Sequence, residues 1–419
     1  MTHTRDFVTR ENILSEINKA FLSRHADYNE RRKGAREVLN KSSNKIDNFI
    51  KVGAPMHCAL QVFNEAKWLT NYAEAWDRVA ALCRKLEFLT QEPDYSPLRQ
   101  CEDGSWGRWY RTPFMKIEPT VDALQSRAVQ AEPIKPLRFM KHLQKPEAVL
   151  ALLYRLQISE IGVTGLNLRD ELGAMLSNLS QLIFKDEIRA LLANPALGFK
   201  ITPRLEDTYR DFLKQTQHPR TGYWGPWYRF GDRLVMVQDL SFTFHNVSYL
   251  SGHIDRWNEV IDTTLAIRTL TYPGGWRPQD GTEPFNNHNN YDVIQILFYG
   301  WPHMSHDQKS KACEAVYAMV TWCFASSLRG NSFAEDSTVD GYYYGVRFLD
   351  RAGYWDLSNR FWLYGGRTMP PGPDPYTLAI ELTQGFTKVK DDSAESESVA
   401  AILDRSLRLT RPGAQGPQA

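Results

Sequence analysis

Apolar residues recur every three or four positions along most of the chain, which is the period of an amphipathic helix. Between Asp6 and about Gln91 this pattern predicts successive helices, and Val79, Cys83 and Leu86 share one apolar face. Strand signals are nearly absent. The period predicts further helices at 121–129, 146–161, 168–192, 204–217, 234–252, 256–270, 292–301, 307–324 and 340–351.

Glycine- and tryptophan-rich loops interrupt the helical segments. Gly104 to Arg111 (GSWGRWYR) and Gly222 to Arg229 (GYWGPWYR) match at six of eight positions, and Gly353 to Trp362 forms a third aromatic loop. The repeat spacing is too long for a solenoid of single hairpins, so it indicates two joined multi-helix halves. We therefore predict an all-α fold, an α/α toroid of antiparallel helical hairpins, with an irregular helical solenoid as the competing architecture.

The domain boundaries follow the composition. We predict one toroid domain over residues 1–387, with a helical N-terminal part at 1–92 and the toroid body at 93–387. Residues 388–419 are polar and low in aromatic residues, which is typical of a disordered tail.

Charge and cysteine content narrow the range of partners. The chain has 50 basic and 49 acidic residues and a formal net charge of +1, which argues against nucleic acid or an anionic membrane as partner. The N-terminal MTHTRDFVTR lacks the apolar segment of a signal peptide, so we expect a cytoplasmic protein. The five cysteines are scattered without metal-type spacing, and we expect neither a metal nor a cofactor. The sequence does not indicate an oligomeric state.

The candidate site lies in the segment from Gly274 to Trp301, where a polar loop enters an apolar helix. Four asparagines and His288 directly precede or begin this helix, although a helix cap requires only one asparagine. The surplus amide and imidazole groups are suited to a bound ligand. Within a helix, His288, Tyr291 and Asp292 would share one face.

Two resemblances bear on these residues. Loops such as DGSWG and TGYWG resemble the glycine-tryptophan turns of the six-hairpin toroid superfamily, which includes terpenoid cyclases, protein prenyltransferases and many glycan-active enzymes. The segment NNHNNYDVIQ is similar to the NNHGTWYDVQ-type segment of toroid polysaccharide lyases of the alginate lyase kind, although it is one residue shorter. This likeness implies that Asn287 neutralises a uronate carboxylate and that His288 assists it or acts as a base. It further implies that Arg329 supports the carboxylate and that one of Tyr342, Tyr343 and Tyr344 transfers protons. Of these three tyrosines, Tyr343 is the preferred candidate.

Aromatic and polar side chains around these loops are candidates for substrate contact. Trp and Tyr rings can stack on the faces of sugar rings, and we expect a small-molecule or oligosaccharide substrate. The candidate binding residues are Trp224, Trp227, Tyr228, Asp239, His245, Asn246, Trp276, Asp280, Glu283 and Tyr291. The leading expectation is a lyase that cleaves a uronate-containing oligosaccharide by β-elimination.

Three alternatives remain open at the level of sequence. A glycoside hydrolase would use paired loop carboxylates, drawn from Asp280, Glu283 and the later acids Glu335, Asp336 and Asp340. A terpenoid-cyclase-like enzyme has weak support, because the chain body has no DxDD motif and the DDxxE match at Asp391 to Glu395 lies in the polar tail. A non-catalytic toroid would keep the aromatic loops but would need no convergence of His288, Arg329 and a tyrosine.

Overall fold

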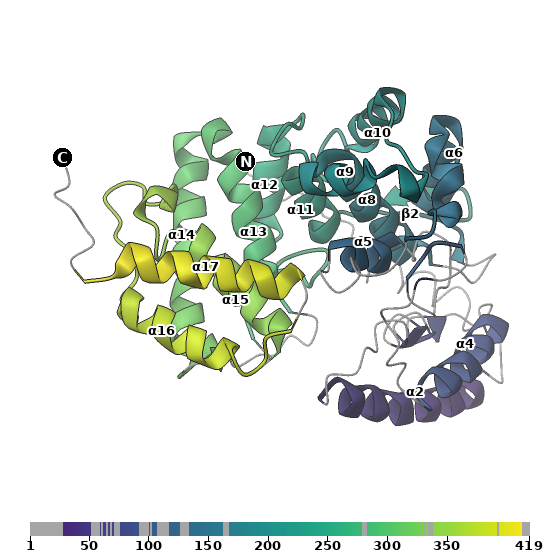
Figure 1. Ribbon diagram of the computed structural model, residues 1–419, viewed down its shortest axis with the longest axis horizontal. Helices are drawn as coiled ribbons and strands as arrows, with labels where there is room; N and C mark the ends of the chain where they lie inside the picture. The colour runs from purple at the N-terminus through teal and green to yellow at the C-terminus, as the bar shows by residue number, and fades with distance from the viewer. Residues whose placement is uncertain are drawn as a thin grey trace. The chain divides into compact units, whose positions relative to one another are not determined.

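A computed structural model (Figure 1) describes most of the chain between residues 28 and 412. The described residues are 28–51, 59, 62–63, 66–67, 69–70, 76–91, 100, 103–106, 117–125, 134–161, 167–278, 283–330, 332–333, 338–391 and 394–412. Within them, no helix combines the length and the apolarity needed to cross a bilayer.

The described chain is mostly helical, which confirms the predicted class. The first helices are α2 (Tyr28–Lys51), α4 (Trp76–Leu89), α5 (Ile117–Gln125), α6 (Pro146–Gln157), α8 (Arg169–Phe184), α9 (Asp186–Leu192) and α10 (Pro203–Thr216). They are followed by α11 (Leu240–Tyr249), α12 (Trp257–Ala266), α13 (Asn287–Gly300), α14 (His306–Trp322), α15 (Val339–Arg351), α16 (Pro375–Phe386) and α17 (Ala394–Thr410). Side-chain caps explain several starts: Asp239 caps α11, Asp374 caps α16, and Ser305 with Gln308 forms a capping box on α14.

The structure contains a small sheet, although strand signals are nearly absent from the sequence. β1 (Ile158–Ser159) pairs in parallel with β2 (Trp227–Phe230), which forms an antiparallel hairpin with β3 (Arg233–Met236). Gly231, at φ 55°, supports the tight turn. The helix expected from residue 234 therefore begins only at Leu240. A second, two-stranded sheet pairs β4 (Leu328–Arg329) with β5 (Ser332–Phe333).

The chain divides into two compact units. Unit 1 comprises residues 1–124, 128–212 and 225–238, and unit 2 comprises residues 125–127, 213–224 and 239–419. Position 92 is not a boundary, because Leu39 of α2 and Leu86 of α4 belong to the same buried core as Tyr228 and Val237. The N-terminal helices and the β2–β3 hairpin are thus parts of one unit.

Unit 2 is built around α13. This helix packs against α11, α12, α14 and α15, and its apolar residues Ile294, Ile296 and Leu297 are fully buried. The nearly continuous apolar run explains its position, since a helix that is apolar all round is stable only when other elements surround it.

The C-terminal segment corrects the prediction of a disordered tail. Residues 394–410 form α17, which packs against α15 and α16 (Figure 1). Val399 and Leu403 are buried, and Arg405 forms an ion pair with Asp350 of α15. Four apolar side chains spaced along one face are enough to dock this helix, although the segment's overall composition is polar: Val399, Ile402, Leu403 and Leu407.

We expect the Leu403→Ala substitution to lower the free energy of unfolding by about 2–5 kcal/mol, because it removes a fully buried side chain and leaves a cavity. The matched control is Leu409→Ala on the same helix, where the side chain is 41% exposed and a change within about 0.5 kcal/mol is expected. Chemical denaturation would measure both. Equal effects of the two substitutions would contradict the docking of α17.

The sequence repeat is also a structural repeat. In the first copy, the Gln100 side-chain amide donates to the Gly104 carbonyl at 2.9 Å, and the Trp106 backbone N–H donates to Thr120 Oγ1 at 3.1 Å. Gly104 has φ +85°, and a Cβ there would lie 2.0 Å from the Pro136 carbonyl oxygen. Only glycine fits this turn.

The second copy, in unit 2, repeats these contacts. The Gln217 amide donates to the Gly222 carbonyl at 2.9 Å, and the Trp224 backbone N–H donates to Thr243 Oγ1 at 3.2 Å. Gly222 also has a positive φ, +68°. Each unit therefore contains one copy of the same glutamine, glycine, tryptophan and threonine arrangement, which supports the inference of two related halves.

Candidate functional site

The first turn of α13 uses three of its asparagines for structure. Asn286 caps the helix by accepting from the Asn289 backbone N–H at 2.8 Å. The Asn289 side-chain amide donates to the Trp276 carbonyl at 2.7 Å, and the Asn287 amide donates to Ser327 Oγ at 2.6 Å. The predicted cap is confirmed, and these bonds hold the start of α13 to the loop before it and to the end of the π-helical turn η7 (Cys323–Ser327).

His288 lies among aromatic rings but is open on one side. Its ring centroid is 4.2 Å from that of Tyr344 and 5.4 Å from that of Tyr272, while 41% of its side chain remains exposed. Loss of hydration among these rings lowers the pKa of His288 to about 4. The imidazole is consequently neutral at physiological pH and accessible, so it can accept a proton, although the lowered pKa makes it a weaker base than an ordinary histidine.

Asp292 lies one turn further along α13 and is fully buried. The Tyr272 hydroxyl donates to Asp292 Oδ2 at 3.2 Å, whereas His288 Nε2 is 3.9 Å from the same oxygen, too far for a hydrogen bond. Burial raises the pKa of Asp292 well above its usual range, and the negative charge of Asp239 adds to this rise. Asp292 therefore keeps its proton to a higher pH than an ordinary aspartate, and at 3.9 Å it forms no hydrogen bond with His288.

This proton makes stability depend on pH. Unfolded Asp292 has a pKa near 3.8, so above that pH the folded state binds more protons than the unfolded state and stability falls as pH rises toward the folded pKa. We expect wild type to lose up to roughly 1.4 kcal/mol per pH unit relative to Asp292→Asn in this window.

Denaturation series from roughly pH 4 to 8 would measure this difference. The contribution of His288 to stability has the opposite pH dependence, because its folded pKa is lowered. Both proteins contain His288, so this contribution cancels in the comparison. Asp232→Asn, at an exposed position in the β2–β3 turn, is the matched control and should run parallel to wild type. Parallel curves for wild type and Asp292→Asn would contradict a protonated Asp292.

A half-buried arginine on α15 contacts two tyrosines of the site. Arg347 Nη1 donates to the Tyr343 hydroxyl at 2.7 Å, and the guanidinium lies 4.9 Å from the Tyr291 ring centroid. The Tyr291 hydroxyl accepts from the Gln295 amide at 2.9 Å. The sequence analysis missed Arg347, although its position four residues after Tyr343 on a helix would have placed both on one face.

Several polar side chains of α11 and α13 are buried. Asn246, Asn290, Asp292 and Gln295 are each at most 4% exposed. Within the described part of the chain, both side-chain polar atoms of Asn246, the Asn290 amide nitrogen, Asp292 Oδ1 and the Gln295 oxygen have no hydrogen-bond partner. Unsatisfied buried groups are costly, so a concentration of them marks a site able to bind polar ligand groups.

The structure brings some of the predicted catalytic residues together and leaves others apart. His288 and Asn287 lie together in the first turn of α13. The tyrosine beside His288 is Tyr344, because Tyr343 points its hydroxyl to Arg347 instead. Arg329 is exposed in β4, two residues after Ser327, and no contact joins it to His288 among the described residues.

The predicted binding residues also separate into groups. Asp239 caps α11, His245 is half-buried with its ring stacked 5.6 Å from that of Tyr249, and Asn246 and Tyr291 lie in the buried interior. Glu283 accepts from the Trp322 indole N–H at 3.1 Å. Asp280, Glu335 and Asp336 lie outside the described residues.

Two of the aromatic loop residues predicted to contact substrate, Trp224 and Tyr228, are buried. Trp224 is 3% exposed and its indole N–H donates to the Leu213 carbonyl at 2.8 Å. Tyr228 is 1% exposed and pairs within the β2–β3 hairpin of unit 1, where Trp227 is half-buried. A buried, hydrogen-bonded ring has no free face for a sugar. Trp276 is equally buried, at 2% exposed, although it borders a cavity.

Comparisons with protein-family models, with curated proteins and with solved structures give no match to this chain.

Proposed function

We propose that the chain is a carbohydrate-active enzyme that cleaves a uronate-containing oligosaccharide by β-elimination at the His288 site. The observation that carries this proposal is the neutral, partly exposed imidazole of His288 against the ring of Tyr344. The likeness of the surrounding segment to alginate-lyase-type enzymes points to the same chemistry.

Elimination requires a base that removes the C5 proton and an acid that protonates the departing O4 oxygen. The lowered pKa of His288 keeps the imidazole free to accept the C5 proton. Burial raises the pKa of the Tyr344 hydroxyl well above its usual range, which keeps it protonated and able to donate to O4. The two rings are neighbours, so one substrate can reach both.

The uronate carboxylate must be stabilised as negative charge develops on it in the enolate-like transition state. The N-terminal end of α13, next to His288, carries the positive end of the helix dipole. The raised pKa of Asp292 reduces its repulsion of a carboxylate, while the Asn290 amide is a buried donor. These groups replace Arg329 in the role that the family likeness implies for it.

We also propose that the helical hairpins belong to an α/α toroid. The support comes from the equivalent hydrogen bonds around Trp106 and Trp224, one set in each unit, and from the successive helices packed on α13.

Incubation with uronate and neutral oligosaccharides tests the reaction. Elimination creates an unsaturated uronate that absorbs ultraviolet light, whereas hydrolysis creates reducing ends without such absorbance. We expect absorbance with uronate substrates only. Reducing ends alone would instead favour the glycoside hydrolase, with the loop acids Asp280 and Glu283 as the first to substitute, and absence of both products would contradict the proposal.

A further inference from the structure

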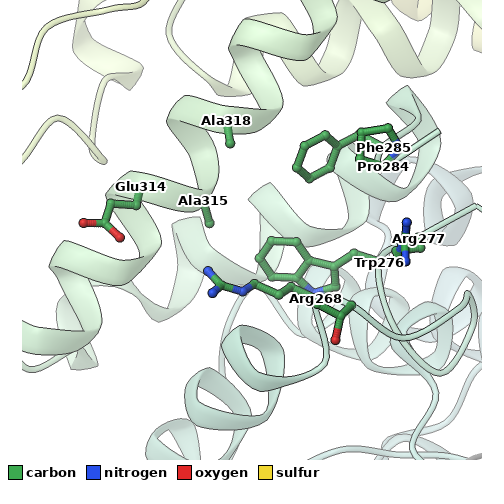
Figure 2. A pocket seen from close by; sticks show the side chains of 9 residues that line it. Arg268, Trp276, Arg277, Pro284, Phe285, Glu314, Ala315 and Ala318 are labelled. Carbon is green, nitrogen blue, oxygen red and sulfur yellow. The ribbon is translucent and has the colours of Figure 1, made fainter.

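Unit 2 contains a second feature that the His288 chemistry does not use, a cavity of about 460 Å³ beside α14. Trp276 and Phe285 form its aromatic walls, and Ala315 and Ala318 of α14 form a flat side (Figure 2). The remaining lining residues are Arg268, Thr269, Arg277, Pro284 and Glu314. This volume is in the range of small-ligand sites and suits one or two sugar rings.

The charge of the cavity is positive. Arg268 and Arg277 both line it, and neither forms an ion pair within the described part of the chain. Among the described lining residues the one carboxylate is that of Glu314, which forms an ion pair with Arg367 at 3.2 Å. In Figure 2 the Arg268 side chain extends across the cavity toward Ala315, whereas Arg277 lies on the far side of Trp276. Guanidinium groups bind carboxylates through paired hydrogen bonds.

One loop connects the cavity with the His288 site. The Arg277 carbonyl accepts from the Tyr272 N–H at 2.8 Å, and the Trp276 carbonyl accepts from the Asn289 amide at 2.7 Å. Tyr272 in turn contacts both His288 and Asp292. A ligand held on one side of this loop is therefore positioned next to the start of α13, although His288 and Tyr344 do not line the cavity.

We propose that this cavity is a subsite for an acidic sugar, which holds one uronate ring against Phe285 with its carboxylate on Arg268. The identification of the sugar rests on the proposed function, whereas the preference for an anionic ring rests on the cavity itself. Neutral sugars would stack on the same walls but would leave the guanidinium groups without a partner, which makes charge the basis of selection.

Isothermal titration with D-glucuronate and D-glucose tests the subsite directly. We expect glucuronate to bind wild type at least tenfold more tightly than glucose, and Arg268→Gln to weaken glucuronate about tenfold, as expected for loss of a charged hydrogen bond. Ala318→Phe, on an exposed position of α14, should fill the cavity and abolish binding. Arg220→Gln removes the same charge from an exposed turn outside the cavity and should bind as wild type does.

Different experimental results would contradict the proposed subsite and the proposed reaction. His288→Ala should bind glucuronate normally, because His288 does not line the cavity. Glucuronate binding that is unaffected by both Arg268→Gln and Ala318→Phe, or that is no tighter than glucose binding, would overturn the subsite. Normal binding without elimination on any uronate oligosaccharide would leave the subsite intact and count against the proposed function alone.

Discussion

The His288→Ala enzyme is expected to cleave uronate oligosaccharides with kcat/KM lowered about 10³-fold, the usual contribution of a positioned general base. The physical reason is the neutral imidazole, which is open to solvent on one side and backed by Tyr344 and Tyr272 on the other. No other imidazole contacts Tyr344 among the described residues, so none can take over its proton transfer. Initial rates from ultraviolet absorbance would measure the effect.

The matched control is His303→Ala. His303 is exposed, and its ring stacks on Trp257 with centroids 5.4 Å apart, away from the site residues. Its removal should change kcat/KM by less than twofold. The wild-type rate should also persist at low pH until the imidazole is protonated near pH 4, the value to which burial lowers the pKa of His288. A His288→Ala enzyme with more than a tenth of wild-type activity would contradict its role as base.

The Gly275→Ala substitution is expected to lower the free energy of unfolding by about 3 kcal/mol, at the upper end of the usual cost of overpacking. A Cβ at this position would lie 2.3 Å from the Ile267 carbonyl oxygen and 2.4 Å from the Leu270 carbonyl oxygen. Both obstacles are backbone atoms, so no side chain can rotate away. The loop must move, and Tyr272 and Trp276 would move with it. Elimination and glucuronate binding should therefore decline together.

Gly274→Ala provides the comparison for this loop. Its nearest obstacle would be the Thr271 carbonyl oxygen at 3.3 Å, which requires a shift of only a few tenths of an ångström. We expect a stability change below about 1 kcal/mol and nearly wild-type activity. Denaturation curves, initial rates and glucuronate titration on both variants would check the pair. If Gly275→Ala is no worse than Gly274→Ala, the loop is not the rigid connection described above.

The parts of the fold that depend on local pattern could be predicted from the sequence. The cap at Asn286, the helix it starts and the repeat around Trp106 and Trp224 each follow from short-range chemistry. Helix α17 was missed because its docking depends on a few apolar positions, including Leu403, within a polar composition. The division into two units was missed because the contacts that define it join residues far apart in sequence.

In the candidate site, too, only the features that depend on local sequence could be predicted. The sequence placed His288 and Asp292 on one face of a helix, as found. It did not identify Tyr272 or Arg347, because only tertiary packing brings their side chains to α13. The choice among the three consecutive tyrosines also required the structure, since each points in a different direction around α15 and only Tyr344 meets the imidazole.

The path of the chain between its two units bears on how the protein can be made and divided. Residues 213–224 belong to unit 2, residues 225–238 return to unit 1, and the chain then continues in unit 2 from residue 239. Neither unit is one continuous piece of polypeptide, so no single cut yields two complete fragments. During synthesis, unit 1 cannot be completed until the β2–β3 hairpin has left the ribosome. By then residues 213–224 of unit 2 have already emerged, before the rest of that unit has been made. Expression of either unit alone would therefore require a rejoined or circularly permuted gene rather than a simple truncation.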